Sequence, residues 1–330
     1  MKLSVGILTY NQEKFIRQCL DSVLMQEVDF EYEIVVGDDA SSDTTLDILQ
    51  EYVSRINDKM SRAKALNEPH SVLNDGGCVG IRVIKSEKNE GISMNYKKVL
   101  SACTGGYIAL CEGDDYWTDP HKLQVQVDFL ESHPDYGFVG TYNTLLFPDG
   151  TIKDDPYDYF PEPIHEGDWE LYGDVFEYAK CGPVTRTVSL CFRKKLIEDC
   201  IQYVGMGNDM VLQTILAKHS KFAKHTASMC VYRQGGVSTD KLSIEKQLYY
   251  NRWFVDNRLL QKKLFPKDCN WDEDELADRE TYIRLKDAIK HRRVREAIRL
   301  KRKLKSDVYN NKLYSKFLFG PVTCWMLSFK

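Results

Sequence analysis

Short apolar runs of strand length alternate with amphipathic helical segments through the N-terminal part of the chain. Leu3–Leu8 and Glu33–Val36 are two such runs, and residues 15–24 and 46–56 place apolar side chains at helical spacing after them. Because crossover connections between such strands are right-handed, the two strands are predicted to be parallel neighbours in one sheet. The pattern therefore predicts an α/β fold with a Rossmann-like, mostly parallel central sheet flanked by helices.

Two adjacent carboxylates follow a further strand. Tyr107–Cys111 is predicted to be buried on both faces of the sheet, and the acidic run Glu112–Asp115 comes directly after it. Like charges side by side resist desolvation, so a hard divalent cation, Mg²⁺ or Mn²⁺, is the expected partner at this edge. The alternative is that Asp114 or Asp119 caps the helix expected to begin near Pro120.

Two other acidic stretches also allow two interpretations. Gly37–Thr44 lies between a predicted strand and a predicted helix, where an Asp could accept hydrogen bonds from a nucleotide base or ribose. Ser42 or Asp43 could instead be an ordinary N-cap of that helix. Gly205–Asp209 opens a later helix, and Asp209 could be its cap or a functional carboxylate.

The remaining segments of the first 240 residues are less informative. Residues 57–80 are polar and lack a period, so we expect an insertion made of loop and a short helix. Phe138–Tyr142 and Thr187–Phe192 are predicted strands. Leu146–Gly173 is rich in Pro, Asp and aromatic residues, which is typical of a surface loop over a binding cleft.

The C-terminal part of the chain has a different character. From about Asp240 the apolar residues keep helical spacing, and Lys286–Lys305 holds ten Lys or Arg residues against two acidic ones. Such a basic amphipathic helix could lie on an anionic membrane surface, or it could be a solvated helix packed on the rest of the protein. Phe317–Phe329 is apolar and aromatic but too short to span a bilayer.

Composition excludes several classes of protein. With 43% hydrophobic and 28% charged residues the chain can bury a full core, and its net charge of −4 argues against general nucleic-acid binding. The 10 cysteines contain no C-x-x-C pair, which favours buried free thiols in a reducing cytosol over a zinc site. The N-terminus shows no export signal, so a cytoplasmic protein is expected.

Three motifs occur in the order and spacing of a known family. Val5–Asn11, Val36–Asp43 and Glu112–Trp117 together resemble the family 2 glycosyltransferases, whose fold is called GT-A. The resemblance covers roughly residues 1–240 and is strong in the first half of that range. In the second half only two short stretches match, Gly207–Asp209 and Val231–Arg233. It implies an inverting, metal-dependent glycosyltransferase that uses a nucleoside-diphosphate sugar, with a UDP-sugar as the usual donor of the family.

The resemblance also implies a domain organisation. Residues 1–240 would form the GT-A domain, in which residues 1–117 bind the nucleotide sugar and residues 118–240 bind the acceptor. Residues 241–330 would form a helical extension. The acceptor would be a glycan or a lipid-linked glycan, as in the synthesis of a cell-surface polysaccharide or glycolipid, and the enzyme would work in the cytoplasm or at the inner face of the plasma membrane.

The resemblance also implies a set of site residues. The nucleotide sugar would contact Thr9, Tyr10, Asp39, Asn95 and Asp114. Asp115 would bind the Mn²⁺ or Mg²⁺ ion, Asp209 would be the general base, and Trp117 would contact the acceptor. The chain departs from the commonest family pattern in having Glu-Gly-Asp-Asp, and in lacking a His shortly after Arg233 that many relatives carry.

Three other classes fit the sequence less well. A signalling receiver domain could use Asp38 and Asp39 but would leave Asp114 and Asp115 unexplained. A sugar-phosphate nucleotidyltransferase should open with a Gly-rich loop carrying Arg and Lys, and Gly6 stands alone. The absence of Asp115 or Asp209 would have favoured a non-catalytic carbohydrate-binding protein on the same fold, and both residues are present.

Overall fold

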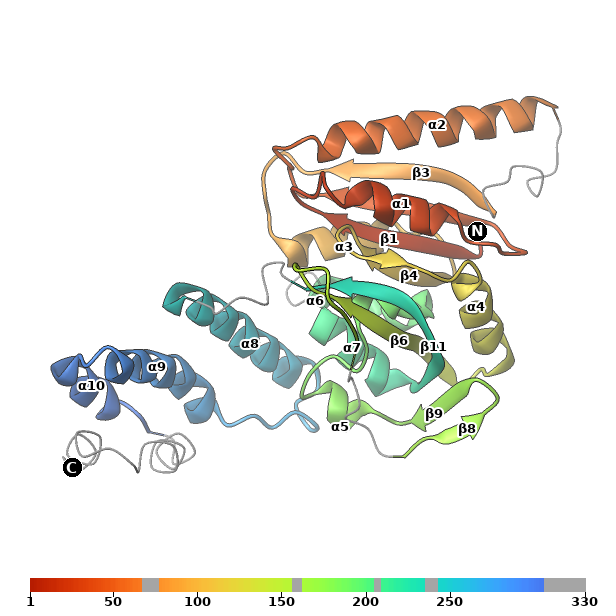
Figure 1. Cartoon of the computed structure of the whole chain (residues 1–330). Coiled ribbons are helices and arrows are strands. Elements are labelled where there is room, and N and C mark those ends of the chain that lie inside the picture. The colour runs from red at the N-terminus through yellow and green to blue at the C-terminus, as the bar shows by residue number, and fades with distance from the viewer. Residues whose placement is uncertain (67–76, 156–161, 205–208, 235–242, 306–330) are drawn as a thin grey trace. The chain divides into compact units, whose positions relative to one another are not determined.

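The protein consists of two compact units, Met1–Ser238 and Thr239–Lys330. Figure 1 shows a computed structural model of the chain, which describes residues 1–66, 77–155, 162–204, 209–234 and 243–305. The first unit contains a large sheet with helices on both of its faces, and the second unit is helical.

The first half of the first unit alternates strands and helices as its sequence predicts. Its elements are β1 (Leu3–Thr9), α1 (Ile16–Leu24), β2 (Tyr32–Asp38), α2 (Thr45–Leu66), β3 (Cys78–Lys85), α3 (Ile92–Ala102) and β4 (Tyr107–Glu112). The second half is more irregular. Its helices and strands are β5 (Tyr116–Trp117), α4 (Lys122–Ser132), β6 (Tyr136–Leu146), β7 (Ile152–Asp154), β8 (Ile164–Glu166), β9 (Trp169–Gly173), α5 (Phe176–Ala179), β10 (Cys191–Arg193), α6 (Ile201–Val204), α7 (Asp209–His219) and β11 (Lys221–Arg233).

One sheet of 11 strands joins both halves, in the order β3-β2-β1-β4-β10-β6-β11-β9-β8, with β5 and β7 paired to the side. The strands β3, β2, β1 and β4 are parallel, and Val5 lies opposite both Ile34 and Ala109. The α/β class and the predicted parallel pairing of β1 with β2 are confirmed. The expectation of a mostly parallel sheet holds for these four strands, whereas the other half mixes parallel and antiparallel pairs.

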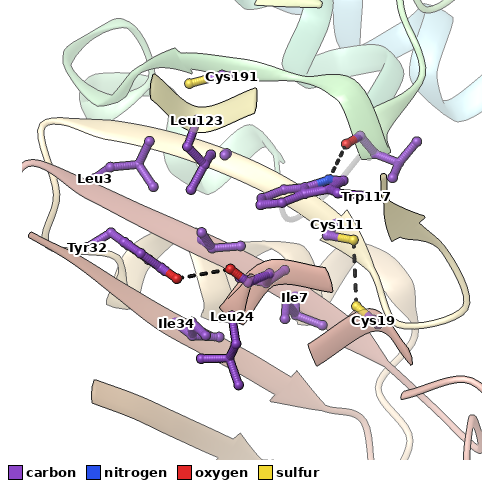
Figure 2. Packing of buried hydrophobic residues seen from close by; sticks show 14 of the residues in the cluster. Leu3, Ile7, Cys19, Leu24, Tyr32, Ile34, Cys111, Trp117, Leu123 and Cys191 are labelled. Atoms are coloured by element: carbon purple, nitrogen blue, oxygen red, sulfur yellow. Dashed lines mark hydrogen bonds between the residues drawn. The ribbon is translucent and has the colours of Figure 1, made fainter. Parts of the chain in front are cut away.

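The two faces of the sheet pack against different helices. Leu3, Val5 and Ile7 of β1 belong to a core cluster that also contains apolar residues of α1, α2 and α4. Figure 2 shows part of this cluster, including the Tyr32 hydroxyl that donates to the Val23 carbonyl at 2.9 Å. The other face of the same strands lies under α3, since a Cβ atom at Gly6 would come within 2.9 Å of the Val99 side chain. All apolar side chains of β1 are thereby removed from water, which is the main stabilising term for such a layered fold.

Several segments differ from the prediction. Helix α2 continues into the region expected to be an insertion loop, and residues 67–76 of that region lie outside the described residues. Thr187–Phe192 is not one strand: Thr187–Ser189 forms a 3₁₀ turn, and only Cys191–Arg193 pairs in the sheet. The region 146–173 is not only a loop, because β7, β8 and β9 lie within it and pair with their neighbours. The pairing of β9 with β11 depends on a strand distant in the sequence, whereas β6 with β7 and β8 with β9 are local antiparallel pairs that the sequence analysis did not predict.

The second unit contains α8 (Ile244–Leu264), α9 (Glu273–Lys290) and α10 (Val294–Lys301). The predicted acidic helix start is confirmed, since the Asp272 side chain accepts from the Asp274 and Glu275 amides. Residues 286–305 do not form one helix, because the chain turns at Arg292, whose φ is 56°. Phe317–Phe329 lies outside the described residues. Within the described ranges, every helix is too short or too polar to cross a bilayer.

The predicted apolar face of the basic segment is used inside this unit. Ala297, Leu300 and Leu304 pack with residues of α9 in a small core cluster, and Ile289 packs against it. Attachment of residues 286–305 to an anionic membrane surface stays a prediction, and this packing leaves mainly the charged side chains of the segment to make it. Its charged side chains remain on the outside.

Candidate functional site

The loops that follow β1 and β2 hold each other at one edge of the sheet. The Asn11 amide donates to the Ser41 Oγ at 2.9 Å, and the Ser42 amide donates to the Asn11 Oδ1 at 2.8 Å. Asn11 and Ala40 adopt φ values of 53° and 62°, a region that residues other than glycine rarely occupy. Backbone strain of this kind at the carboxyl end of parallel strands is typical of a ligand site.

Asp39 joins these loops to a third one. Its carboxylate accepts hydrogen bonds from the Glu90 and Gly91 amides, each at 2.8 Å, and Gly91 is the N-cap residue of α3. Asp39 is buried, and its own amide donates to the Thr9 carbonyl at 3.1 Å. The carboxylate predicted to contact a nucleotide thus also fixes the start of α3.

Buried polar atoms without a hydrogen-bond partner gather at this edge. Within the described residues, the Thr9 Oγ1, the Asn95 Oδ1 and the Asp115 Oδ2 have no partner. The other side of the Asn95 amide is used, because its Nδ2 donates to the Gly37 carbonyl at 2.8 Å. An unsatisfied buried polar group is costly, so such atoms indicate a place where a polar ligand supplies the missing partner.

The acidic run after β4 brings three carboxylates together. The Asp115 Oδ1 accepts from the Arg233 amide at 2.8 Å, which connects the end of β4 to the end of β11. Burial, and then the charges of Asp114 and Glu112, raise the pKa of Asp115 well above its ordinary value. Burial also raises the pKa of Asp114, and burial with the charges of Asp114 and Asp209 raises the pKa of Glu112 to about 8.

This charge arrangement fits a divalent cation. The described residues contain no ready-made cluster of three His, Cys, Asp or Glu ligands. Even so, an unpartnered carboxylate oxygen of Asp115 lies among mutually repelling carboxylates, and an oxygen-seeking cation would offset that repulsion. Asp115 is 1% exposed, whereas Asp114 is less enclosed. A cation reaching the site from solvent would therefore meet Asp114 as well as Asp115.

Asp209 reaches the same place from a distant part of the sequence. It is the first residue of α7, and its Oδ1 accepts from the Met210 amide at 2.9 Å. Burial raises the pKa of both Glu112 and Tyr96, and the nearby charge of Asp209 raises each of them further. Burial raises the pKa of Asp209 itself. The fold thus places a separate carboxylate beside the acidic run of β4.

Two of the predicted contact residues differ widely in solvent exposure. Tyr10 is 46% exposed, which leaves it available to a ligand. Trp117 is 1% exposed, its Nε1 donates to the Val188 carbonyl at 2.8 Å, and the Lys122 Nζ lies 4.1 Å from its ring. The prediction that Trp117 contacts the acceptor is wrong, because pairing of β5 with β11 turns this side chain into the core (Figure 2).

Sequence reasoning missed other residues at this edge. The Arg233 guanidinium lies 4.9 Å from the centres of the Phe15 and Tyr116 rings. Burial raises the pKa of Asp114, and the positive charge of Arg233 partly offsets that rise. The Gln12 side chain also contacts Asp114 and lies where a Cβ atom at Gly113 would come. Gln12 directly follows the Thr9–Asn11 motif, and only this adjacency could have pointed to it.

Comparisons with known proteins agree with this arrangement. The sequence model described as "Glycosyl transferase family 2" matches residues 4–179, more than half of the chain. An uncharacterised protein of Mycobacterium tuberculosis (strain H37Rv) is 40% identical over 232 residues, which is 70% of this chain and 58% of that protein. The chain thus spans little more than half the length of this relative.

Two solved proteins share the fold. Poly(ribitol-phosphate) β-N-acetylglucosaminyltransferase TarS of Staphylococcus aureus (strain Mu50) is 30% identical over 134 residues, or 40% of this chain and 19% of TarS. A crystal structure of TarS residues 1–349 with UDP-GlcNAc superposes with a TM-score of 0.52 at 15% identity, covering 99% of this chain and 87% of that one. The mannosyltransferase PcManGT of Pyrobaculum calidifontis, solved with GDP-mannose and Mn²⁺, gives the same TM-score and identity, covering 98% and 83%. These neighbours establish the GT-A fold.

Proposed function

This chain belongs to glycosyl transferase family 2, and on that premise we propose that it is an inverting enzyme that transfers a sugar from a UDP-sugar to a hydroxyl of a glycan or lipid-linked glycan. One observation carries this proposal: Asp209 lies near the acidic run at the end of β4. At the same edge of the sheet, polar atoms near the loops after β1 and β2 have no hydrogen-bond partner. One edge therefore offers a nucleotide site, a cation site and a base.

The nucleotide is proposed to lie over the carboxyl ends of β1 and β2. Thr9, Asn95 and Asp39 would contact its base and ribose, since the first two have unpartnered oxygens there and Asp39 lies in the same loop cluster. Tyr10 is exposed beside them and offers a ring face. We favour UDP because the structure of TarS holds UDP-GlcNAc, although PcManGT was solved with GDP-mannose.

The diphosphate is proposed to lie at the acidic run. Asp114 and Asp115 would hold Mn²⁺ or Mg²⁺, and the bound cation would supply positive charge to the leaving nucleoside diphosphate. The Arg233 guanidinium, whose charge acts on Asp114, offers a second positive charge at this place. The structure of PcManGT contains Mn²⁺, which supports the choice of a divalent ion.

The chemistry follows from one carboxylate on the far side of the donor. Asp209 would take the proton from an acceptor hydroxyl while the oxygen bonds to the anomeric carbon of the donor sugar. The bond from that carbon to the diphosphate oxygen breaks, and its electron pair leaves with the nucleoside diphosphate. A single displacement of this kind inverts the anomeric centre.

The acceptor is proposed to be part of a cell-surface polysaccharide or glycolipid. TarS bears the name of an enzyme that modifies poly(ribitol-phosphate), which supports an acceptor of that broad kind. The exposed cations of α10 and the residues after it would attract the anionic inner leaflet of a membrane, which would place the enzyme at its cytoplasmic side.

The decisive variant is Asp209→Asn. Asn keeps the shape and most of the capping ability of Asp but cannot accept the proton. We expect turnover to fall roughly a hundredfold or more, with melting temperature and donor binding close to wild type. If transfer continues at the wild-type rate, Asp209 is a helix cap and the proposed mechanism fails.

The donor class is testable separately. The purified protein is heated with UDP, GDP and other nucleoside diphosphates, each with and without Mn²⁺. A ligand that binds only the folded state raises the melting temperature, so the expected result is stabilisation by UDP that depends on Mn²⁺. Stabilisation by GDP alone would reassign the donor, and an unchanged melting temperature with every nucleotide would contradict a nucleotide-sugar site.

A further inference from the structure

The second unit holds two arginine side chains against aromatic rings. The guanidinium of Arg258 in α8 lies 4.7 Å from the centre of the Phe254 ring and 3.8 Å from the centre of the Trp271 ring. The guanidinium of Arg279 in α9 lies 3.9 Å from the centre of the same Phe254 ring. Like charges repel, so an anion bound beside Phe254 between α8 and α9 would offset the repulsion between these two cations.

Arg279 brings a charge that the described part of the chain does not neutralise by contact. Among the described residues its guanidinium makes no ion pair, and its Nε is buried without a hydrogen-bond partner. The carboxylates next to it in the sequence are engaged elsewhere. The Glu280 Oε1 lies 2.8 Å from the Arg284 Nη2. The Asp278 Oδ2 accepts a hydrogen bond from the Lys305 amide. A partly buried charge of this kind calls for a counter-charge from a ligand.

Other side chains around Phe254 carry buried polar atoms without a partner. Within the described residues, the Trp271 Nε1, the Asn251 Oδ1 and the Asn257 Oδ1 form no hydrogen bond. Asn251 and Asn257 lie three residues before and three residues after Phe254, which makes them its neighbours on the surface of α8, and they are 4% and 1% exposed. The Asn257 Nδ2 is satisfied, because it donates to the Trp253 carbonyl at 2.7 Å. Each unpaired buried group is costly, so a ligand that pairs several of them at once is favoured.

The missing partners indicate the chemistry of the ligand. The unpaired N–H groups of Trp271 and Arg279 need acceptor oxygens, and two guanidinium groups match a phosphate monoester, which carries about 1.5 to 2 negative charges at neutral pH. A carboxylate would bring only one charge. The unpaired oxygens of Asn251 and Asn257 need donors, which hydroxyl groups supply. A phosphorylated sugar or polyol carries both kinds of group. Because Phe254, Trp271 and Arg279 are partly exposed, such a ligand can reach them from solvent.

We propose that the second unit binds the phosphate group of a phosphorylated sugar or polyol between α8 and α9. The phosphate oxygens accept from Trp271 and Arg279 and lie beside the Arg258 charge. The hydroxyl groups of the ligand donate to Asn251 and Asn257. This inference goes beyond the proposed function, because the site belongs to the unit Thr239–Lys330 and requires no reaction at the carboxylates of the first unit.

Calorimetric titration of the full chain with glycerol 3-phosphate tests the site. The titration is made without a divalent cation, so that the phosphate is not drawn to the proposed cation site. Arg279→Gln should bind at least tenfold more weakly than wild type, because it removes a charge that contacts the phosphate. Arg284→Gln is the matched control. It removes the same charge from the same helix, at a position paired with Glu280, and should bind as wild type.

Two further variants separate the phosphate contacts from the hydroxyl contacts. Trp271→Phe keeps an aromatic ring beside Arg258 but lacks the Nε1 donor, so glycerol 3-phosphate and inorganic phosphate should both bind several-fold more weakly. Asn251→Ala should weaken the binding of glycerol 3-phosphate alone, because inorganic phosphate lacks the alcohol hydroxyls. The melting temperature of each variant without ligand reports its folding. If Arg279→Gln does not fold, Trp271→Phe decides in its place.

Two sources could supply a ligand of this chemistry. One is a soluble phosphate ester, and the other is a lipid headgroup such as that of phosphatidylinositol 4-phosphate. Co-sedimentation with vesicles that contain this lipid is therefore compared for wild type, Arg279→Gln and Arg284→Gln. Dependence on Arg279 in calorimetry indicates the soluble source, and dependence on Arg279 in co-sedimentation alone indicates the headgroup. The proposal is overturned if wild type binds neither ligand, or if Arg279→Gln and Arg284→Gln bind both equally well.

The failure of this inference can be told apart from the failure of the proposed function. Binding of UDP in the presence of Mn²⁺ is measured on the same proteins and should be unchanged in Arg279→Gln. If UDP does not bind but binding of glycerol 3-phosphate still depends on Arg279, the nucleotide-sugar site is refuted and the site in the second unit stands. If UDP binds while the phosphate ester and the vesicles show no dependence on Arg279, only the second site is refuted.

Discussion

Asp114 and Asp115 are neighbours in sequence with unequal surroundings. Asp115 is almost fully buried and tied to the Arg233 amide, whereas Asp114 is less enclosed and lies against Gln12. The pair therefore combines a carboxylate fixed by the fold with one that a ligand can reach. Gly113 and Asp114 lie in a turn in which the Asp115 amide donates to the Glu112 carbonyl at 2.9 Å, and this turn gives the two adjacent carboxylates different surroundings.

Asn substitutions at these two positions should have the same effect on transfer but different effects on stability. We expect Asp114→Asn and Asp115→Asn each to abolish Mn²⁺-dependent transfer, because each removes an anionic ligand from the proposed cation site. Loss of charge at Asp115 should also leave the apo protein as stable as wild type or slightly more stable, since its repulsion with Asp114 and Glu112 is relieved. The measurements are turnover against Mn²⁺ concentration and melting temperature. Wild-type turnover by a folded Asp115→Asn protein would remove this residue from the cation site.

Asp39 should affect both stability and nucleotide binding. Asp39→Ala removes the acceptor of the Glu90 amide and one of the two acceptors of the Gly91 amide, at a cost of about 1 to 3 kcal/mol in the free energy of unfolding. If Asp39 also contacts the nucleotide, binding of UDP should weaken by a further 1 to 3 kcal/mol or so. Asp39→Asn is the matched control, because it retains one acceptor oxygen. Calorimetry that gave equal UDP affinity for Asp39→Ala and wild type would limit this residue to holding the loop.

Helix α3 packs closely against the sheet at positions where the strands carry glycine. A Cβ atom at Gly37 of β2 would lie 2.2 Å from the Asn95 Oδ1 and 2.5 Å from the Val99 Cγ2, closer than real contacts allow. This close approach puts the Asn95 side chain against the end of β2, where its Nδ2 meets the Gly37 carbonyl. The position of a proposed ligand-binding side chain thus depends on the absence of one methyl group in the strand beneath it.

Gly37→Ala should therefore be destabilising. We expect a loss of roughly 1 to 3 kcal/mol in the free energy of unfolding from overpacking, and weaker UDP binding because α3 and Asn95 are displaced. Gly80→Ala on neighbouring β3 is the control, since a Cβ atom there would meet only the Asn57 Oδ1, at 3.5 Å. Chemical denaturation of both variants gives the comparison. Equal stability of the two would contradict the close packing of α3.

The second unit shows how packing restricts the use of an amphipathic segment. Ala297 and Leu300 of α10 are buried in a cluster with residues of α9, so charge is the main feature left to attract a membrane to residues 286–305. Attachment through this unit should therefore be electrostatic and weak, and should disappear as salt is added. The apolar and aromatic stretch Phe317–Phe329 lies outside the described residues.

Vesicle binding by the full chain tests this prediction. We expect co-sedimentation with vesicles of anionic lipid at low salt, loss of binding at high salt, and a several-fold reduction in the double variant Arg295→Glu with Lys303→Glu. Lys153→Glu with Lys195→Glu reverses the same number of exposed charges in the first unit and should bind as wild type. If both double variants lose binding equally, net charge rather than the second unit governs attachment.

The elements that follow from local pattern were predictable. The alternation of strands and helices up to β4, the carboxylates at the end of β4 and the acidic start of α9 all depend on periodicity, burial and capping within short windows. The parallel pairing of β1 with β2 follows from the same pattern, because the crossover rule leaves one arrangement. The resemblance of three motifs then indicated the family, which the match to residues 4–179 establishes.

What only the tertiary structure decided is which distant residues meet. The 13 residues of β11 bring the Arg233 amide to Asp115, and α7 brings Asp209 to Glu112. Pairing of β5 with β11 turns Trp117 into the core, against the sequence prediction. A short window of sequence fixes which side chains lie on one face of an element. Which partners that face then meets depends on contacts between residues far apart in the sequence, and their free energy is shared by the whole sheet.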